Sequence, residues 1–148
     1  MKVKIAQMNI KDGSVRENLD QMLSILGDCE ATIDLIVFPE TTLSGFPKVE
    51  ELSSVALPLS SFAIERIRSE ARTRRVGVAF GFAESDGTDV FNTALLVSKF
   101  GEILLRDRKT HLWRKTDKGL FSAGDTYSTF IFDGLRVGLL ICYDIEFP

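Results

Sequence analysis

A mixed α/β fold, with a layered sheet and outer helices, is the fold class that the sequence predicts. The first half of the chain alternates short apolar segments with helical stretches in the order β-α-β-α, which is typical of parallel sheets. The second half is a run of apolar segments separated by turn residues, which is typical of antiparallel pairing. With 148 residues, the chain fits one domain that can bury a real core.

The first predicted elements are a strand, a helix and a second strand. Residues 3–8 alternate in polarity and predict the first strand. Ser14 and Glu17 form a capping-box pattern, which predicts a helix that starts there and ends near Gly27. Residues 34–38 are the next predicted strand. The apolar stripe of this helix consists of Val15, Leu19, Met22, Leu23 and Leu26.

A second helix is predicted from Phe62 to about Arg74. Ser60 or Ser61 precedes it and is a suitable N-cap residue. The apolar spacing indicates that one side of this helix faces the core. The residues expected on that side are Phe62, Ala63, Ile67 and Ala71.

The remaining predicted elements are strands joined by turns. The pair Asp133-Gly134 is a strong hairpin signal between residues 127–132 and residues 135–142. The last of these strands is apolar enough to be expected in a sheet interior, buried on both faces. Three earlier consecutive strands are expected at residues 76–83, 90–98 and 102–107, with turns at Asp86-Gly87 and Phe100-Gly101.

Composition excludes several function classes. The chain has 18 basic and 21 acidic residues and no basic face, which argues against a nucleic-acid partner. Its apolar runs are too short to span a membrane, and residues 1–6 lack the pattern of a signal peptide. One histidine and two distant cysteines do not supply zinc-ligand spacing, and no nucleotide-binding motif is present. We therefore expect no metal, no cofactor and a reducing, cytoplasmic location.

Cys142 is a candidate nucleophile, because it ends an apolar strand at the point where polarity returns. A cysteine at a strand-to-turn junction can present its sulfur rigidly to an open site. The alternative is a small apolar residue that closes a core strand. Cys29 lies in a helix-like segment and is expected to be structural.

Two other strand ends carry charged residues. Glu40 follows an apolar run and Pro39, and a proline cannot continue a central strand. Lys109 follows another apolar run and lies two residues before His111, the only histidine. Taken singly, Glu40 is more commonly a glutamate in a solvated loop, and Lys109 is consistent with a charged turn.

These three residues and their surroundings resemble the carbon–nitrogen hydrolase family, also called the nitrilase superfamily. The matching blocks are VFPE followed by LSGF, RKTHLW, and LLICYDIEFP, together with the opening KVKIAQMN and FSAGD at residues 121–125. The blocks occur in the order of the family, each at a predicted strand end. The resemblance spans residues 2–148, whereas the family's domain is roughly twice as long. It therefore predicts one carbon–nitrogen hydrolase domain, 1–148, incomplete at its C-terminal end.

The resemblance implies an αββα sandwich, of which this chain is roughly the N-terminal half. It also implies a catalytic triad of Glu40, Lys109 and Cys142, with the backbone N–H of Tyr143 and the Lys109 ammonium stabilising an oxyanion. The implied reaction is hydrolysis of a small linear amide to an acid and ammonia through a cysteine thioester. A nearby ammonium such as that of Lys109 favours the thiolate form of a cysteine.

Three further residues are expected to support the site. Asp117 occupies the position of a second family glutamate but is one methylene shorter, so its reach to Lys109 is an open point. His111 is an alternative base, since Cys–His pairs are common, but we rank it below Glu40 and expect it to pack or hydrogen-bond near the rim. Asp144 is expected to orient the turn after Cys142.

Several alternatives stay open at this point. The same triad serves carbamoyl, ω-amide or nitrile hydrolysis, and a chain of this length could also be an inactive fragment that acts as an interaction module. The expected partners are a small-molecule amide or nitrile and further copies of the chain, as a homodimer or larger oligomer. Because few residues follow Cys142, we expect exposed apolar surface and an open sheet edge.

Overall fold

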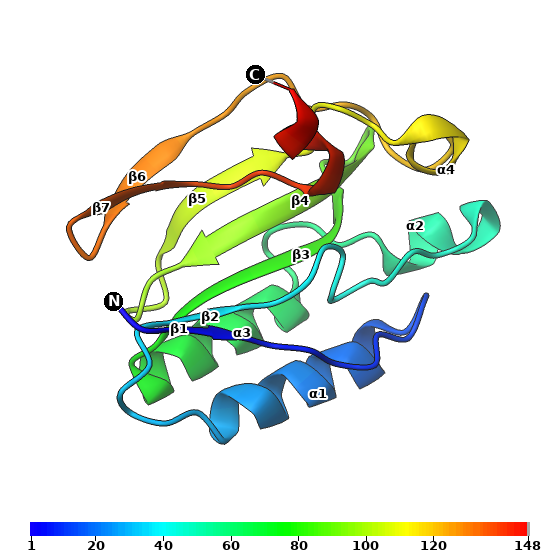
Figure 1. The fold of residues 1–148 in the computed structure, drawn as a ribbon. Helices are drawn as coiled ribbons and strands as arrows, with labels where there is room; N and C mark the ends of the chain where they lie inside the picture. The colour runs from blue at the N-terminus through cyan, green and yellow to red at the C-terminus, as the bar shows by residue number, and fades with distance from the viewer. Residues whose placement is uncertain (148) are drawn as a thin grey trace.

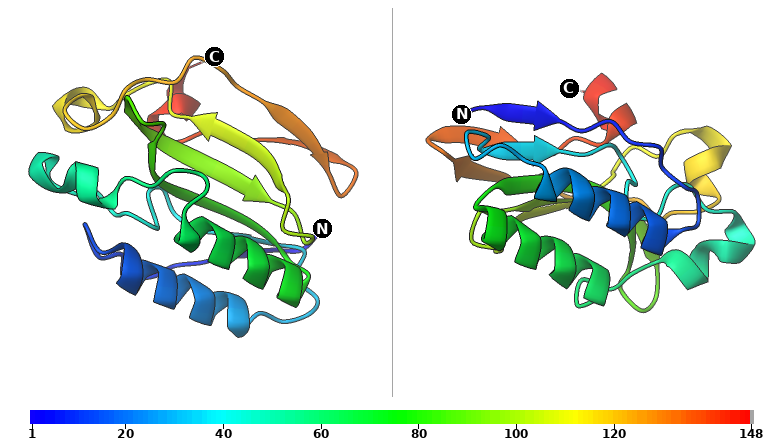
Figure 2. Two further views of the ribbon diagram at one scale, coloured as in Figure 1. Left: turned by 180° about the vertical axis from the view of Figure 1, so that it is seen from behind. Right: turned by 90° about the horizontal axis from the view of Figure 1, so that it is seen from below.

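The computed structural model describes residues 1–147 and shows three layers (Figure 1). Helices cover one face of a five-stranded sheet, and a two-stranded hairpin lies over the other face, as both views of Figure 2 also show. Pro148, the last residue of the third matching block, lies outside the described residues. The mixed sheet with outer helices confirms the predicted fold class.

The five strands lie side by side in the order in which they occur in the chain. Strands β1 (Val3–Ile5), β2 (Leu35–Val37) and β3 (Gly77–Ser85) are parallel, whereas β4 (Val90–Val97) and β5 (Ile103–Arg108) continue antiparallel. This is the predicted change from parallel to antiparallel pairing. Strand β1 is shorter than predicted, because its ladder to β2 ends at Ile5.

Helices α1 (Val15–Gly27) and α3 (Phe62–Arg74) have the predicted bounds and pack on the same face of the sheet. Ser61 caps α3, since its hydroxyl accepts a hydrogen bond from the Ile64 N–H at 3.4 Å. The prediction for Phe62 was wrong: its side chain is 76% exposed, and Ile64 is the fully buried residue of that turn. Phe62 is the first residue of α3, where the helix has not yet turned its side chain toward the sheet.

The N-terminal cap of α1 differs from the predicted capping box. The Ser14 hydroxyl hydrogen-bonds the Glu17 carboxylate at 3.1 Å and makes no capping hydrogen bond to the helix backbone. The helix still begins directly after Ser14. The unpredicted short helical segments include η1 (Val49–Glu51), α2 (Leu52–Val55) and α4 (Arg114–Lys118).

The hairpin consists of β6 (Thr129–Phe132) and β7 (Leu135–Gly138), joined at the predicted Asp133-Gly134 turn. The prediction of a doubly buried strand reaching Cys142 was wrong, because the ladder ends at Gly138 and Leu135 is 52% exposed. Only the inward side chains, such as Phe132, pack against the five-stranded sheet. The hairpin carries the exposed apolar surface that we expected, on both of its faces. Its exposed apolar residues include Phe130, Ile131 and Leu135.

Two hydrophobic clusters hold these layers together. The larger one lies between the helices and the sheet, and the smaller one lies between the sheet and the hairpin. The chain then leaves β7 and runs as residues 139–141 into the turn η2 (Cys142–Glu146), which lies over the sheet end where β2 and β5 also terminate. Within residues 1–147, no helix is long and apolar enough to cross a membrane.

Candidate active site

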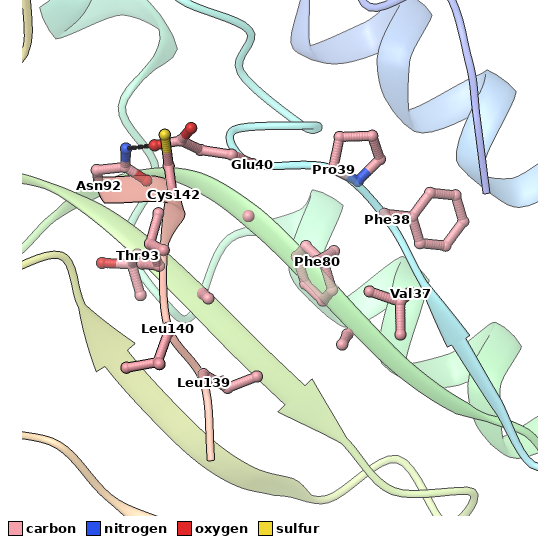
Figure 3. A pocket seen from close by; sticks show the side chains of 14 residues that line it. Val37, Phe38, Pro39, Glu40, Phe80, Asn92, Thr93, Leu139, Leu140 and Cys142 are labelled. Carbon is pink, nitrogen blue, oxygen red and sulfur yellow. Dashed lines mark hydrogen bonds between the residues drawn. The ribbon is translucent and has the colours of Figure 1, made fainter. Parts of the chain in front are cut away.

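Cys142 begins η2 and presents an exposed side chain. Its φ of 49° lies in the left-handed region, which is uncommon for a residue other than glycine. Strained backbone of this kind is concentrated at functional sites, although it does not by itself assign a function. The Cys142 sulfur lies beside the Glu40 side chain (Figure 3).

Glu40 follows β2 in a tight turn that rests directly on the middle of β3. A Cβ atom at Gly81 would lie 2.5 Å from the Thr41 nitrogen and 3.2 Å from the Glu40 carbonyl carbon, so only glycine allows this approach. Thr41 itself has a φ of 48°. The Glu40 carboxylate is therefore held at a fixed place above the sheet rather than in a solvated loop.

Lys109 follows β5 and is almost completely buried, with 1% of its surface exposed. Its Nζ lies 2.8 Å from Glu40 Oε1 and 2.6 Å from Asp117 Oδ2. Burial acts to lower the pKa of Lys109, but hydrogen bonds to Asp117 and Glu40 outweigh it and raise the pKa. The ammonium is therefore a fixed positive charge between two carboxylates.

Asp117 reaches Lys109 in spite of its shorter side chain. The carboxylate is 2% exposed, and its Oδ2 accepts hydrogen bonds from the Lys109 ammonium and, at 2.9 Å, from the Trp113 N–H. Helix α4, which Trp113 precedes, brings Asp117 toward the sheet. The structure thus answers the open point about reach to Lys109.

The pKa of the Cys142 thiol is raised, contrary to the expectation that Lys109 would favour the thiolate. Burial raises the pKa most, and the charge of Glu40 raises it further. Lys109 and the Tyr143 N–H act in the opposite direction but do not compensate. The Glu40 carboxylate, which contributes to this rise, lies beside the sulfur and is a candidate proton acceptor.

Asp144 joins the turn of Cys142 to the segment after Lys109. Its Oδ1 accepts hydrogen bonds from the backbone N–H groups of Thr110 at 3.2 Å and His111 at 2.8 Å, and its Oδ2 accepts one from the Ile141 N–H at 3.2 Å. Burial acts to raise the pKa of Asp144, but these hydrogen bonds outweigh it and lower the pKa. This is the geometry expected of a residue that orients the turn.

His111 lies beside this connection and contacts Tyr127, Asp144 and Phe147. Its Nδ1 lies 3.0 Å from the Tyr127 hydroxyl and 3.2 Å from Asp144 Oδ1. Its ring stacks on Phe147, with centroids 3.8 Å apart. Among the described residues, the hydrogen bonds of His111 do not include one to Cys142, which fits a packing and hydrogen-bonding residue better than a base.

A cavity of about 150 Å³ opens beside these groups, between the sheet and residues 139–142 (Figure 3). Glu40, Asn92 and Cys142 lie at one end of it, and the rest of its wall is mainly apolar. The other wall residues include Val37, Phe38, Ala79, Phe80, Leu139 and Leu140. Within the described chain, no cluster of side chains could hold a metal ion.

Asn92 is the site residue that sequence reasoning missed. It lies on β4, is fully buried, and its Nδ2 donates a hydrogen bond to Glu40 Oε1 at 2.7 Å. The available signal was the pair Asn92-Thr93 inside an otherwise apolar strand, because asparagine is depleted in strands.

Nearly the whole sequence matches one family model. Residues 2–148 match the family described as Carbon-nitrogen hydrolase. An (R)-stereoselective amidase of Pseudomonas sp is 43% identical over 148 residues, which are 100% of this chain and 53% of the relative. The 2-oxoglutaramate amidase of Bacillus subtilis (strain 168) is 30% identical over 148 residues, covering 99% of this chain and 57% of the relative.

Solved structures show the same fold. An amidase from Nesterenkonia sp. superposes with a TM-score of 0.89 at 25% identity, and the match covers 99% of this chain and 57% of that chain. The chain therefore spans about half the length of the relatives that it matches.

Proposed function

The chain belongs to the carbon–nitrogen hydrolase family, and from that premise we propose that it supplies the catalytic residues for hydrolysis of a small linear amide. The products are the carboxylic acid and ammonia. Glu40 is the base, Cys142 the nucleophile, and Lys109 the fixed positive charge.

The observation that carries this proposal is the convergence of three side chains from separate segments of the chain. Glu40 and Lys109 are 69 positions apart in the sequence, yet their charged atoms lie 2.8 Å apart. Cys142 lines the same cavity as Glu40. A base, an ammonium and a thiol at one cavity end make up an activated nucleophile.

The first chemical step forms the sulfur–carbon bond. Glu40 takes the thiol proton as the Cys142 sulfur attacks the carbonyl carbon of the amide. The carbonyl π electrons move to oxygen and produce a tetrahedral oxyanion. The Tyr143 N–H and the Lys109 ammonium are the donors proposed to stabilise it, and one such donor typically contributes about 3–4 kcal/mol to transition-state stabilisation.

The second step breaks the carbon–nitrogen bond. Protonated Glu40 gives its proton to the leaving nitrogen, ammonia departs, and a thioester remains on Cys142. Glu40, again a carboxylate, then takes a proton from water, whose oxygen attacks the thioester carbon. The carbon–sulfur bond breaks, the thiol regains a proton, and the acid is released.

Amide hydrolysis is preferred because two relatives that cover almost all of this chain are described as amidases. Carbamoyl, ω-amide and nitrile substrates use the same attack at carbon and are the alternatives. A non-catalytic interaction module is a further alternative, which the exposed apolar side chains of the β6–β7 hairpin favour. The same side chains are also candidates for contacts in a homo-oligomer.

Ammonia release from a panel of short aliphatic amides, carbamoyl compounds and nitriles tests this function in the full-length protein. We expect ammonia from at least one linear amide, and none above background from Cys142→Ala. Turnover by Cys142→Ala would overturn the cysteine mechanism. A correctly folded protein that releases ammonia from no member of the panel would favour the interaction module.

A further inference from the structure

Asn92 occupies an unusual position for a buried polar side chain. Its Nδ2 donates to Glu40 Oε1 at 2.7 Å, and the side chain is fully buried. Its Oδ1 is buried and has no hydrogen-bond partner within residues 1–147. An unpaired buried acceptor lowers stability, so its retention needs an explanation.

The orientation of this amide follows from its neighbour. Turning the side chain over would bring Asn92 Oδ1 against Glu40 Oε1, and two acceptor oxygens repel each other. The amide therefore keeps its N–H toward Glu40 and leaves its own oxygen unpaired. A residue that only filled space in β4 would not carry this cost, since an apolar side chain would avoid it.

Asn92 also contacts the second member of the triad through its backbone. Its carbonyl oxygen accepts a hydrogen bond from the Lys109 N–H at 2.8 Å. Glu40 Oε1 accepts hydrogen bonds from both the Asn92 amide and the Lys109 ammonium. One residue of β4 thus fixes where Lys109 leaves the sheet and where the Glu40 carboxylate lies.

We propose that Asn92 is a positioning residue that holds the Glu40 carboxylate in the direction needed for a base acting on Cys142. This inference rests on the proposed function, because it assigns Glu40 the role of base. A neutral hydrogen-bond donor suits this task. It restricts the rotation of the carboxylate, yet it adds no further charge between Glu40 and Lys109.

Two substitutions separate this role from a purely structural one. Asn92→Asp replaces the donor with a second carboxylate beside Glu40, and two adjacent carboxylates resist joint ionisation. The acid limb of kcat/KM against pH should therefore move up by about one pH unit or more. Asn92→Ala removes the donor and should lower kcat by about 10- to 100-fold, while KM changes by less than about threefold.

Asn18→Asp is the matched control. Asn18 is equally buried, and its side chain bonds only backbone groups, those of Lys11 and Leu43. Like Asn92→Asp, this variant buries a new carboxyl group, but it does not place a second carboxylate beside Glu40. We expect it to lower the melting temperature without moving the acid limb of the pH profile.

The experiment measures kcat and KM from pH 5 to 9 in the full-length protein, with melting temperatures for every variant. An unchanged acid limb in folded Asn92→Asp, or a loss in Asn92→Ala that lies in KM alone, would overturn the positioning role. If Asn92→Asp does not fold, the kcat and KM values of Asn92→Ala test the positioning role. Activity in Cys142→Ala, measured alongside, would instead refute the proposed function.

Discussion

The Lys109 ammonium lies 2.6 Å from Asp117 Oδ2, and both side chains are almost fully buried. A buried ion pair of this kind costs desolvation on both sides and is weak evidence for a contribution to stability. Its value here is geometric, because it directs the same ammonium toward Glu40 at 2.8 Å. An aspartate at position 117, although shorter than a glutamate, is therefore long enough to hold the Lys109 ammonium in place.

The charge of Asp117 should matter more than its size. Asp117→Asn keeps the shape but leaves Lys109 with one carboxylate partner, and we expect kcat to fall by about 100-fold. Asp117→Glu keeps the charge at the cost of one added methylene in a tight site, and should retain activity within about tenfold of the original. Steady-state kinetics rank the two variants. Equal activity of Asp117→Asn and the unaltered protein would contradict a role in holding Lys109.

Glu40 and His111 should differ sharply as candidate bases. Glu40→Gln keeps the shape of the side chain, removes the proton acceptor and should lower kcat by about 10²- to 10⁴-fold. His111→Ala should cost much less, because His111 hydrogen-bonds Tyr127 and Asp144 instead of the sulfur. The measurement is kcat for both folded variants. If His111→Ala were inactive and Glu40→Gln nearly active, a Cys–His mechanism would replace the present one.

The raised pKa of Cys142 gives a test that needs no substrate. Burial and the Glu40 charge both favour the protonated thiol, so the midpoint of the pH profile for iodoacetamide labelling should lie above that of an ordinary cysteine. Glu40→Gln removes the charge and should shift this midpoint to lower pH, even though it slows turnover severely. Peptide mapping by mass spectrometry follows labelling at Cys142 and at Cys29 separately. A higher midpoint in Glu40→Gln would contradict the assigned cause.

Asp107 and Asp144 are buried aspartates with opposite pKa shifts. Burial raises the pKa of Asp107, and its Oδ2 has no partner within residues 1–147. Because the folded protein binds this proton more tightly than the unfolded chain, protonated Asp107 stabilises the fold at pH values below its ordinary pKa. This contribution to stability is lost as pH rises through the folded-state pKa. Asp107→Asn should therefore increase the free energy of unfolding at pH 7 by about 1 kcal/mol, with the advantage fading toward pH 4.

Asp144→Asn is the matched comparison, because hydrogen bonds lower the pKa of Asp144 in spite of its burial. The stability from its ionised form is present above the ordinary pKa and is lost as pH falls through the folded-state pKa. This variant should be less stable than the unaltered protein at pH 7, with the difference shrinking in acid. Urea unfolding at several pH values checks both, and equal pH dependence for the two variants would contradict the assignment.

The sequence was sufficient to predict what depends on local pattern. The 3.6-residue spacing located α1 and α3, and Asp133-Gly134 located the hairpin. The strand ends at Glu40, Lys109 and Cys142, together with the resemblance, selected the candidate triad. The change from parallel to antiparallel pairing also followed from element order.

What could not be predicted depends on contacts between distant segments. The hydrogen bond from Asn92 to Glu40 joins residues 52 positions apart and exists only because β4 pairs with β3 beneath the Glu40 turn. The early end of β7 depends on which neighbours cover it, and an apolar run carries no such information. The raised pKa of Cys142 likewise follows from packing, which the spacing of charges does not reveal.

The thioester is the central claim, and rapid-quench peptide mass spectrometry tests it most directly. Full-length protein is mixed with an amide that it turns over, quenched in acid within milliseconds and digested. The account predicts an acyl mass increase, with ammonia already released, on the peptide that contains Cys142, and none on the peptide that contains Cys29. Steady turnover with an unmodified Cys142 peptide at every quench time, or equal turnover by Cys142→Ala, would contradict it.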